Sequence, residues 1–274
     1  MSGTLLLPHR EAVVLNPPPL RAMSACRMLR LTDSLQVCID AGDPASYTSG
    51  DKCLDVSGNG YDFHRGADAT TSGSEPTFNG GVGAIKPSAY WSFDGGDYFT
   101  YDTTNETWME NLHKDGAAFT ALFMVYCGSL ATNQTLFGTS AGLTTNVGVR
   151  FVINTGGALV FQVSDGSGAY ALNRATGALV TAGSWHLCGV GLDETANTGA
   201  FYFDTIVNDK AGLTSYATPS AAAATYTMQI GSDGGTTFIM TNTSRMGIAV
   251  MWSRLLLAGE VYRFFTAVRR RFLI

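Results

Sequence analysis

The chain has 274 residues, of which 45% are apolar and 14% charged, so it can bury one large core. Its formal net charge of −5 gives no electrostatic reason to expect nucleic acid as a partner. Prolines interrupt the apolar residues near the start, which leaves no stretch long enough for a secretory signal or a membrane span. We therefore expect synthesis in a cytosol and no insertion into a membrane.

Residues 1–32 differ in composition from the rest of the chain. Pro17-Pro18-Pro19 favours extended polyproline geometry and cannot donate hydrogen bonds to a sheet, so this segment is predicted to be an extended arm. Its apolar side chains would be costly to leave in water, which predicts that the arm docks either on its own sandwich or on a neighbouring chain. The residues expected to make this contact are Leu5, Leu6, Leu7, Val13, Val14 and Leu15.

Residues 33–274 are predicted to form one domain of short strands, beginning with Leu35–Ile39. Two hairpins are expected, one turning at residues 94–97 between Ala89–Phe93 and Tyr98–Tyr101, the other at residues 155–157 between Val149–Asn154 and Ala158–Ser164. A single helix is expected from Leu257 to Arg271. Many strands before one helix favour an all-β fold with two antiparallel sheets.

The predicted terminal helix ends in three consecutive cations. Arg269, Arg270 and Arg271 are placed favourably for the negative end of the helix dipole. The same cluster could instead be a docking patch for an acidic surface, and the sequence leaves both interpretations open.

The five cysteines are odd in number and form no Cys-x-x-Cys pair, which argues against a zinc site and against a complete disulfide framework. We expect them to be structural thiols. Cys38 and Cys53 flank a loop and could pair under oxidising conditions.

An ordered set of short motifs carries a resemblance that covers about residues 35–268. The motifs are Leu54–Gly60, Trp91–Tyr98, Ala118–Phe123, Gly183–Leu187, Gly199–Asp204, Gln229–Gly231 and Trp252–Arg254. In this order they resemble the laminin-G-like, concanavalin A-like superfamily, in the variety found in bacterial surface and phage virion proteins. The resemblance implies a two-sheet antiparallel jelly-roll sandwich.

The resemblance also raises the question of a structural calcium. Many relatives carry an acidic residue in the last strand that helps to hold the ion, and the matching stretch here is Gly247–Val250. Losing a carboxylate weakens the case for calcium, which needs several oxygen ligands. Asp55 and Asn59 could still offer oxygens, or they could act as turn caps, and no other cofactor is expected.

Catalysis is not expected. Some proteins of this fold hydrolyse glycans with closely spaced carboxylates, but the glutamates of this chain are isolated and its histidines are scattered. Binding is the remaining chemistry, because sugar sites on such sandwiches combine aromatic faces with polar groups on loops. The candidates near loop-rich stretches are Tyr47, Trp108, Asp165, Tyr170, Asn173, Tyr216 and Asp233.

Together these features predict a non-catalytic phage virion accessory protein, either a capsid decoration protein or a tail-fibre adhesion component. It would be made in the host cytoplasm and located in the virion. Its expected partners are other virion proteins or further copies of itself, and host surface glycans. The alternative is a cellular or surface carbohydrate-binding lectin that is unrelated to a virion.

Overall fold

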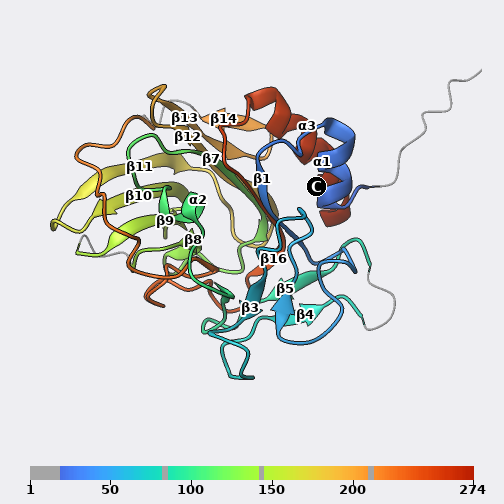
Figure 1. Cartoon of the computed structure of the whole chain (residues 1–274). Coiled ribbons are helices and arrows are strands. Elements are labelled where there is room, and N and C mark those ends of the chain that lie inside the picture. Colours follow the sequence, from blue (N-terminus) through green and yellow to red (C-terminus); the bar gives the residue numbers. More distant parts are fainter. Residues whose placement is uncertain (1–18, 82–85, 142–144, 209–212) are drawn as a thin grey trace, which may run out of the picture.

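The computed structural model describes residues 19–81, 86–141, 145–208 and 213–274 and shows two antiparallel sheets packed face to face (Figure 1). This confirms the predicted all-β sandwich. Among the described residues each sheet has eight strands. No helix in these ranges is long and apolar enough to cross a membrane.

The first sheet, called sheet A, has the order β14-β13-β12-β7-β16-β5-β4, with β1 paired to β16. Its strands are β1 (Leu35–Asp40), β4 (Thr77–Asn79), β5 (Tyr90–Ser92), β7 (Ala118–Tyr126), β12 (Trp185–Asp193), β13 (Thr198–Phe203), β14 (Ile206–Asn208) and β16 (Arg245–Trp252).

The second sheet, called sheet B, has the order β11-β10-β9-β8-β15-β6-β3-β2. Its strands are β2 (Lys52–Cys53), β3 (Phe63–Arg65), β6 (Phe99–Tyr101), β8 (Gln134–Gly138), β9 (Val147–Ile153), β10 (Ala158–Asp165), β11 (Tyr170–Ala178) and β15 (Gln229–Ile230). The helices are α1 (Ala22–Leu29), the short α2 (Thr107–Glu110) and α3 (Ala258–Val268), which continues as a 3-10 turn over Arg269–Phe272.

One of the two predicted hairpins is confirmed. Strands β9 and β10 pair antiparallel, with Phe151 opposite Phe161. Asn154 shapes the turn, because its side-chain oxygen accepts hydrogen bonds from the backbone N–H groups of Gly156 and Ala158, each at 2.9 Å.

The other predicted hairpin is wrong, because β5 lies in sheet A and β6 lies in sheet B. The residues between them cross from one sheet to the other. The inward-facing rings account for this difference: Trp91 packs edge to face against Phe99, with 5.3 Å between the ring centroids. Both rings are fully buried, so this contact across the core stabilises the placement of β5 and β6 in different sheets.

The central strands of sheet A are buried on both faces. Along β7, Phe123 points into the core between the sheets, whereas Leu122 and Met124 belong to a second apolar cluster on the outer face. Helices α1 and α3 cover that outer face and pack side by side (Figure 1). This double burial explains why β7 reads as a continuous apolar run.

The prediction of an extended arm over residues 1–32 is wrong for residues 22–29, which form a helix. Residues 22–29 are the helix α1, which buries Ala22, Ala25 and Cys26 against α3 and sheet A. Residues 19–32 therefore belong to the body of the sandwich. The predicted contacts of Leu5, Leu6, Leu7, Val13, Val14 and Leu15 lie outside the described residues.

The predicted C-terminal helix is confirmed as α3 with its 3-10 extension. Glu260 fixes its start, since one carboxylate oxygen accepts the backbone N–H of Leu257 at 2.8 Å and Arg254 donates to both oxygens, at 2.9 and 3.0 Å. The Arg254 hydrogen bonds are the main reason why the pKa of Glu260 is lowered.

All five cysteines are free and buried, so Cys38 and Cys53 are thiols in this structure. Burial raises the pKa of each of them, in the case of Cys26 to about 12. The prediction of structural thiols is consistent with these surroundings.

A buried ion pair joins the C-terminal 3-10 turn to the end of β1. Arg271 and Asp40 are both fully buried, and the guanidinium donates to both carboxylate oxygens, one of these bonds measuring 2.6 Å. The same carboxylate accepts the backbone N–H groups of Ala22 at 2.7 Å and Gly42 at 2.8 Å. Arg271 is thereby withdrawn from the predicted docking patch, whereas Arg270 is exposed and Arg269 is half-buried.

Replacing Arg271 by Met should lower the free energy of unfolding by about 3–5 kcal/mol, because Asp40 would remain buried without its cation. Urea unfolding monitored by tryptophan fluorescence measures the change. The matched control is Arg27→Met on the exposed side of α1, which should alter stability by less than about 0.5 kcal/mol. Equal losses in the two variants would contradict a structural role for the buried pair.

Candidate functional site

Three loops meet at one rim of the sandwich. Residues 93–98 connect β5 to β6, residues 127–133 connect β7 to β8, and residues 231–244 connect β15 to β16. Each loop joins a strand of sheet A to a strand of sheet B. All three loops cross between the two sheets at this rim. The hollows that they and the adjoining strand residues line form one continuous surface, which we call the rim groove.

Buried Gln134 holds two of these loops together. Its side-chain oxygen accepts hydrogen bonds from the hydroxyls of Thr241 and Ser244 at 2.9 and 2.8 Å and from the backbone N–H of Thr241 at 3.1 Å. Its amide nitrogen donates to the carbonyl of Ser129 at 2.6 Å. Such a satisfied buried polar network gives the loops a fixed shape.

The first hollow of the rim groove measures about 340 Å³ and opens on the outer face of sheet A. Arg245 is its central cation, with the guanidinium carbon 4.9 Å from the ring centroid of Tyr90 and 4.6 Å from that of Tyr126. Cation–π contacts on two rings hold the guanidinium in place. Exposed Asp94 and Asn242 complete the polar side of the hollow.

Two further hollows continue the groove. The second, of about 420 Å³, shares Asp94 and Asn242 with the first and adds the half-buried ring of Phe238. The third, of about 250 Å³, shares Asn133 with the second and reaches Arg150 on sheet B. A groove that alternates planar polar groups with aromatic rings is suited to a ligand with hydroxyls and an apolar ring face.

Arg150 is a buried cation at the sheet B end of the groove. It donates to the side-chain oxygen of Gln162 at 2.5 Å and to the hydroxyl of Tyr170 at 3.1 Å, and its guanidinium lies 4.8 Å from the Phe238 ring centroid. The carboxylate of Asp233 is 3.9 Å away, which makes an ion pair but not a hydrogen bond.

Asp97 is a buried carboxyl group in the wall of the first hollow. Burial is the main reason why its pKa is raised to about 7. The side chain accepts the backbone N–H of Asp94 at 2.8 Å and so shapes the loop that presents Asp94 to the groove.

The structure places several of the predicted ligand residues away from the rim groove. Tyr47 packs in the core with its centroid 4.7 Å from that of Phe78, and Tyr216 is buried with its hydroxyl donating to the Leu112 carbonyl at 2.7 Å. Half-buried Trp108 packs near Tyr61, with 6.2 Å between the ring centroids. Asp165 caps the turn between β10 and β11, accepting the N–H of Ser167 at 2.8 Å.

Three other predicted residues do come together around Arg150. Tyr170 accepts its hydrogen bond, Asp233 pairs with it, and Asn173 accepts a hydrogen bond from the neighbouring Gln162 at 3.1 Å. Asp233 is fully buried and accepts the backbone N–H groups of residues 235 and 237, so it shapes the loop from beneath. A ligand-binding role for Tyr170 and Asn173 stays a prediction.

Asp55 and Asn59 do not fit a calcium site in their present contacts. Both oxygens of Asp55 already accept hydrogen bonds, from the N–H groups of Cys38 and Ser57 and from the Ser57 hydroxyl. Asn59 presents its amide nitrogen, which donates to the carbonyls of Leu35 and Gln36 at 2.9 Å. In the described ranges no group of three or more His, Cys, Asp or Glu side chains is placed to hold a metal ion.

Sequence reasoning missed Arg245, Tyr90 and Arg150. They stand at intermediate or buried positions of strands, where neither charge clusters nor motifs single them out. Asp94 stands in the turn cluster Asp94–Asp97, but in the sequence this cluster predicts a hairpin turn rather than a binding loop.

Comparisons with known proteins found no matching family model and no matching curated protein. Solved structures do match. The binding domain of botulinum neurotoxin DC in complex with SialylT has a TM-score of 0.57 at 12% identity, over 87% of this chain and 52% of that one. A botulinum neurotoxin type C chain scores 0.56 at 11% identity, over 88% and 53%. A Trypanosoma rangeli sialidase in complex with sialic acid scores 0.55 at 14% identity, over 87% and 34%.

These likenesses show a shared β-sandwich fold. The chain spans about half the length of the neurotoxin structures and about a third of the sialidase. The relationship to phage virion proteins stays a prediction from the sequence.

The raised pKa of Asp97 predicts a pH dependence of stability. Between about pH 4 and 7 the folded protein keeps a proton that the unfolded chain has released, so its stability falls as the pH rises through this window. Asp97→Asn keeps an oxygen to accept the Asp94 N–H but cannot ionise. Relative to this variant, the wild type should lose about 1 kcal/mol of unfolding free energy per pH unit from pH 5 to 7, with no further relative loss above about pH 8. Urea unfolding curves that shift in parallel for both proteins would contradict the assignment.

Proposed function

We propose that the rim groove binds glycans that carry a carboxylate, and that the chain is a non-catalytic virion accessory protein that presents this site to host surface glycans. The observation that carries the binding proposal is Arg245, fixed between Tyr90 and Tyr126 in a hollow that also contains Asp94 and Asn242.

Arg245 is suited to an acidic ligand. Within the described part of the chain the salt bridges join other residues, so its guanidinium keeps N–H donors for a ligand carboxylate. A guanidinium can bind a carboxylate with two parallel hydrogen bonds. The ring stacking limits the entropy that the side chain loses on binding, because the guanidinium is already positioned.

The remaining groups of the groove suit the rest of a sugar. Asp94 can accept hydrogen bonds from hydroxyls, and Asn242 can both donate and accept them. The rings of Tyr90 and Phe238 offer apolar surface to the carbon face of a sugar ring. Two of the similar structures were solved with SialylT and with sialic acid, which supports an acidic sugar as the ligand class.

The proposal is non-catalytic because the carboxyl groups of the groove have structural tasks. Asp97 is buried and caps the Asp94 N–H, and Asp94 caps the N–H of Gly96 at 2.8 Å. The virion role is supported by the resemblance of the ordered sequence motifs and by the apolar residues near the start of the chain.

Calorimetry of the full chain against a panel of sialylated and neutral glycans tests the binding proposal. Sialylated glycans should bind, and Arg245→Ala and Asn242→Ala should each weaken their binding at least tenfold, about 1.4 kcal/mol. The matched control, Arg174→Ala, removes an exposed arginine of β11 and should leave binding unchanged.

Two results would overturn this proposal. Equal binding by Arg245→Ala and the wild type would exclude the rim groove as the site. Release of free sialic acid or new reducing ends from the same panel, lost in Asp94→Asn, would show that the chain is an enzyme.

The virion role needs a separate experiment. A tagged copy expressed in phage-producing cells should sediment with purified particles, and immunogold labelling should place it on their surface. A tagged chain that stays with the host cells and never sediments with particles would favour the alternative of a cellular lectin.

A further inference from the structure

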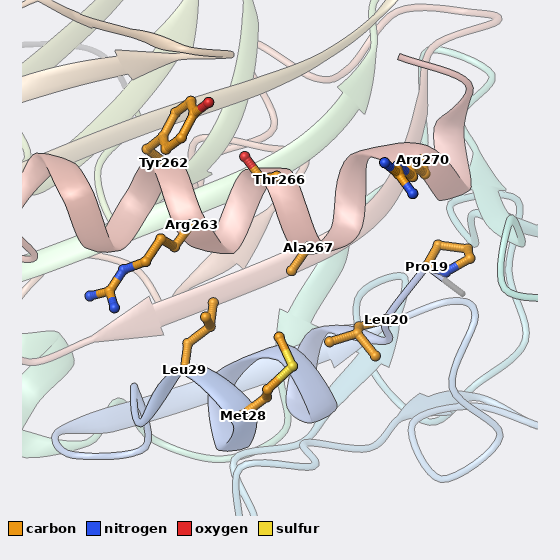
Figure 2. A pocket seen from close by; sticks show the side chains of 9 residues that line it. All are labelled: Pro19, Leu20, Met28, Leu29, Tyr262, Arg263, Thr266, Ala267 and Arg270. Carbon is orange, nitrogen blue, oxygen red and sulfur yellow. The ribbon is translucent and has the colours of Figure 1, made fainter. Parts of the chain in front are cut away.

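Helices α1 and α3 leave an apolar groove between them on the outer side of the molecule. Figure 2 shows Leu20, Met28 and Leu29 on one side and Ala267 on the other, with Pro19 and Arg270 at the same end. Its volume of about 380 Å³ lies within the roughly 300–1,000 Å³ of clefts that bind ligands. The residues that line it are Pro19, Leu20, Met28, Leu29, Tyr262, Arg263, Thr266, Ala267 and Arg270.

The groove, here called the helix groove, is open to solvent, and its two walls are joined by a backbone hydrogen bond. Met28 is 61% exposed and Tyr262 is 52% exposed, although both are large apolar side chains. The backbone N–H of Leu20 donates to the carbonyl of Ala267 at 3.1 Å and ties the two walls together. A contiguous exposed apolar surface of this kind is typical of a site that binds another protein, a membrane or a ligand.

The position of the groove indicates which polypeptide binds there. The described chain begins at Pro19, which itself forms one end of the groove, and 18 residues precede it. Those residues include Leu5-Leu6-Leu7 and Val13-Val14-Leu15 but only one acidic and one arginine side chain. Every copy of the chain therefore carries an apolar segment attached beside an apolar groove.

The proline run decides between the two ways in which this segment can reach a groove. Pro17-Pro18-Pro19 favours an extended chain that rises about 3.1 Å per residue and resists bending over several residues. Helix α1 starts beside Leu20 at this end and runs along the groove to Leu29, so the residues before Pro19 would have to reverse direction to lie in the groove of their own molecule. A stiff proline run disfavours such a reversal. A second molecule offers the same groove without requiring a reversal of the chain.

We propose that the helix groove binds residues 5–15 of a second copy of this chain, so that two molecules exchange their N-terminal segments. Reciprocal exchange would give a closed dimer with two identical contacts. The proposal is independent of glycan binding, since none of the residues of the helix groove lines the rim groove.

Light scattering after size-exclusion chromatography tests the exchange with three variants of the full chain. The wild type should be a dimer. Deletion of residues 2–16 should give a monomer, and so should Met28→Glu combined with Thr266→Glu, which places carboxylates in the groove at exposed positions that the fold tolerates. Leu273→Glu, at a residue that is 95% exposed and outside the groove, should remain dimeric.

Mixing the two monomeric variants gives the decisive result. The deletion variant keeps an intact groove and the groove variant keeps an intact segment, so together they should form a mixed dimer although neither dimerises alone. A labelled peptide of residues 1–16 should bind the deletion variant and bind the groove variant at least tenfold more weakly.

A wild type that stays monomeric while the peptide still binds would show that the segment occupies its own groove, and would overturn exchange. A dimer that survives the groove substitutions would overturn the groove as the binding surface.

Discussion

The buried carboxylate of Asp40 joins three segments of the described chain that lie far apart in the sequence. It binds Arg271 at the C-terminal end, Ala22 at the start of α1 and Gly42 after β1. A buried ion pair repays its desolvation only when further hydrogen bonds satisfy its remaining atoms, and here two backbone N–H groups and the Pro87 carbonyl do so. Position 42 must be glycine for this approach, because a Cβ there would overlap the Arg271 guanidinium and the Pro87 carbonyl. The pair thereby fixes α1 and the 3-10 turn at the same edge of β1.

Sheet A has two different outer regions. Towards the Trp252 end of β16, which pairs with Leu35 of β1, α1 and α3 cover the sheet with an apolar cluster that includes Trp252 and Phe264. Towards the strand ends at the rim, the helices no longer cover it, and Arg245 and Tyr90 face outward. The same sheet thus offers an apolar surface to a polypeptide and a polar, aromatic surface to a small ligand.

How much of this could be predicted depends on whether the deciding contact is local. The β9–β10 hairpin could be inferred from Asn154 and the residues beside it, and the terminal helix from its own apolar spacing. The β5–β6 crossing could not be predicted, because the turn cluster is equally compatible with a hairpin and the choice is made by Trp91 packing on Phe99 across the sandwich. Helix α1 could not be predicted either, because the proline run directly before it favours an extended segment. Among the predicted ligand residues, Tyr47 and Tyr170 both lie near loop-rich stretches of the sequence. Only tertiary packing distinguishes them, because it buries Tyr47 and leaves Tyr170 half-buried.

The two outer regions of sheet A are physically joined by a row of aromatic rings. Trp185 lies 6.0 Å from Tyr90 and 5.9 Å from Tyr126, the rings that hold Arg245, and 4.6 Å from Phe272, the residue after Arg271. Gly247 of β16 makes room for this row, because a Cβ at that position would overlap the Phe272 ring. Within one copy these packed rings hold the rim groove at a fixed position relative to the helix groove. Glycans are displayed in many copies on a cell surface, and two rigidly spaced sites gain affinity only for ligands at a matching distance. In a dimer that exchanges its N-terminal segments, the distance between the two rim grooves would therefore affect which spacings of surface glycans are bound.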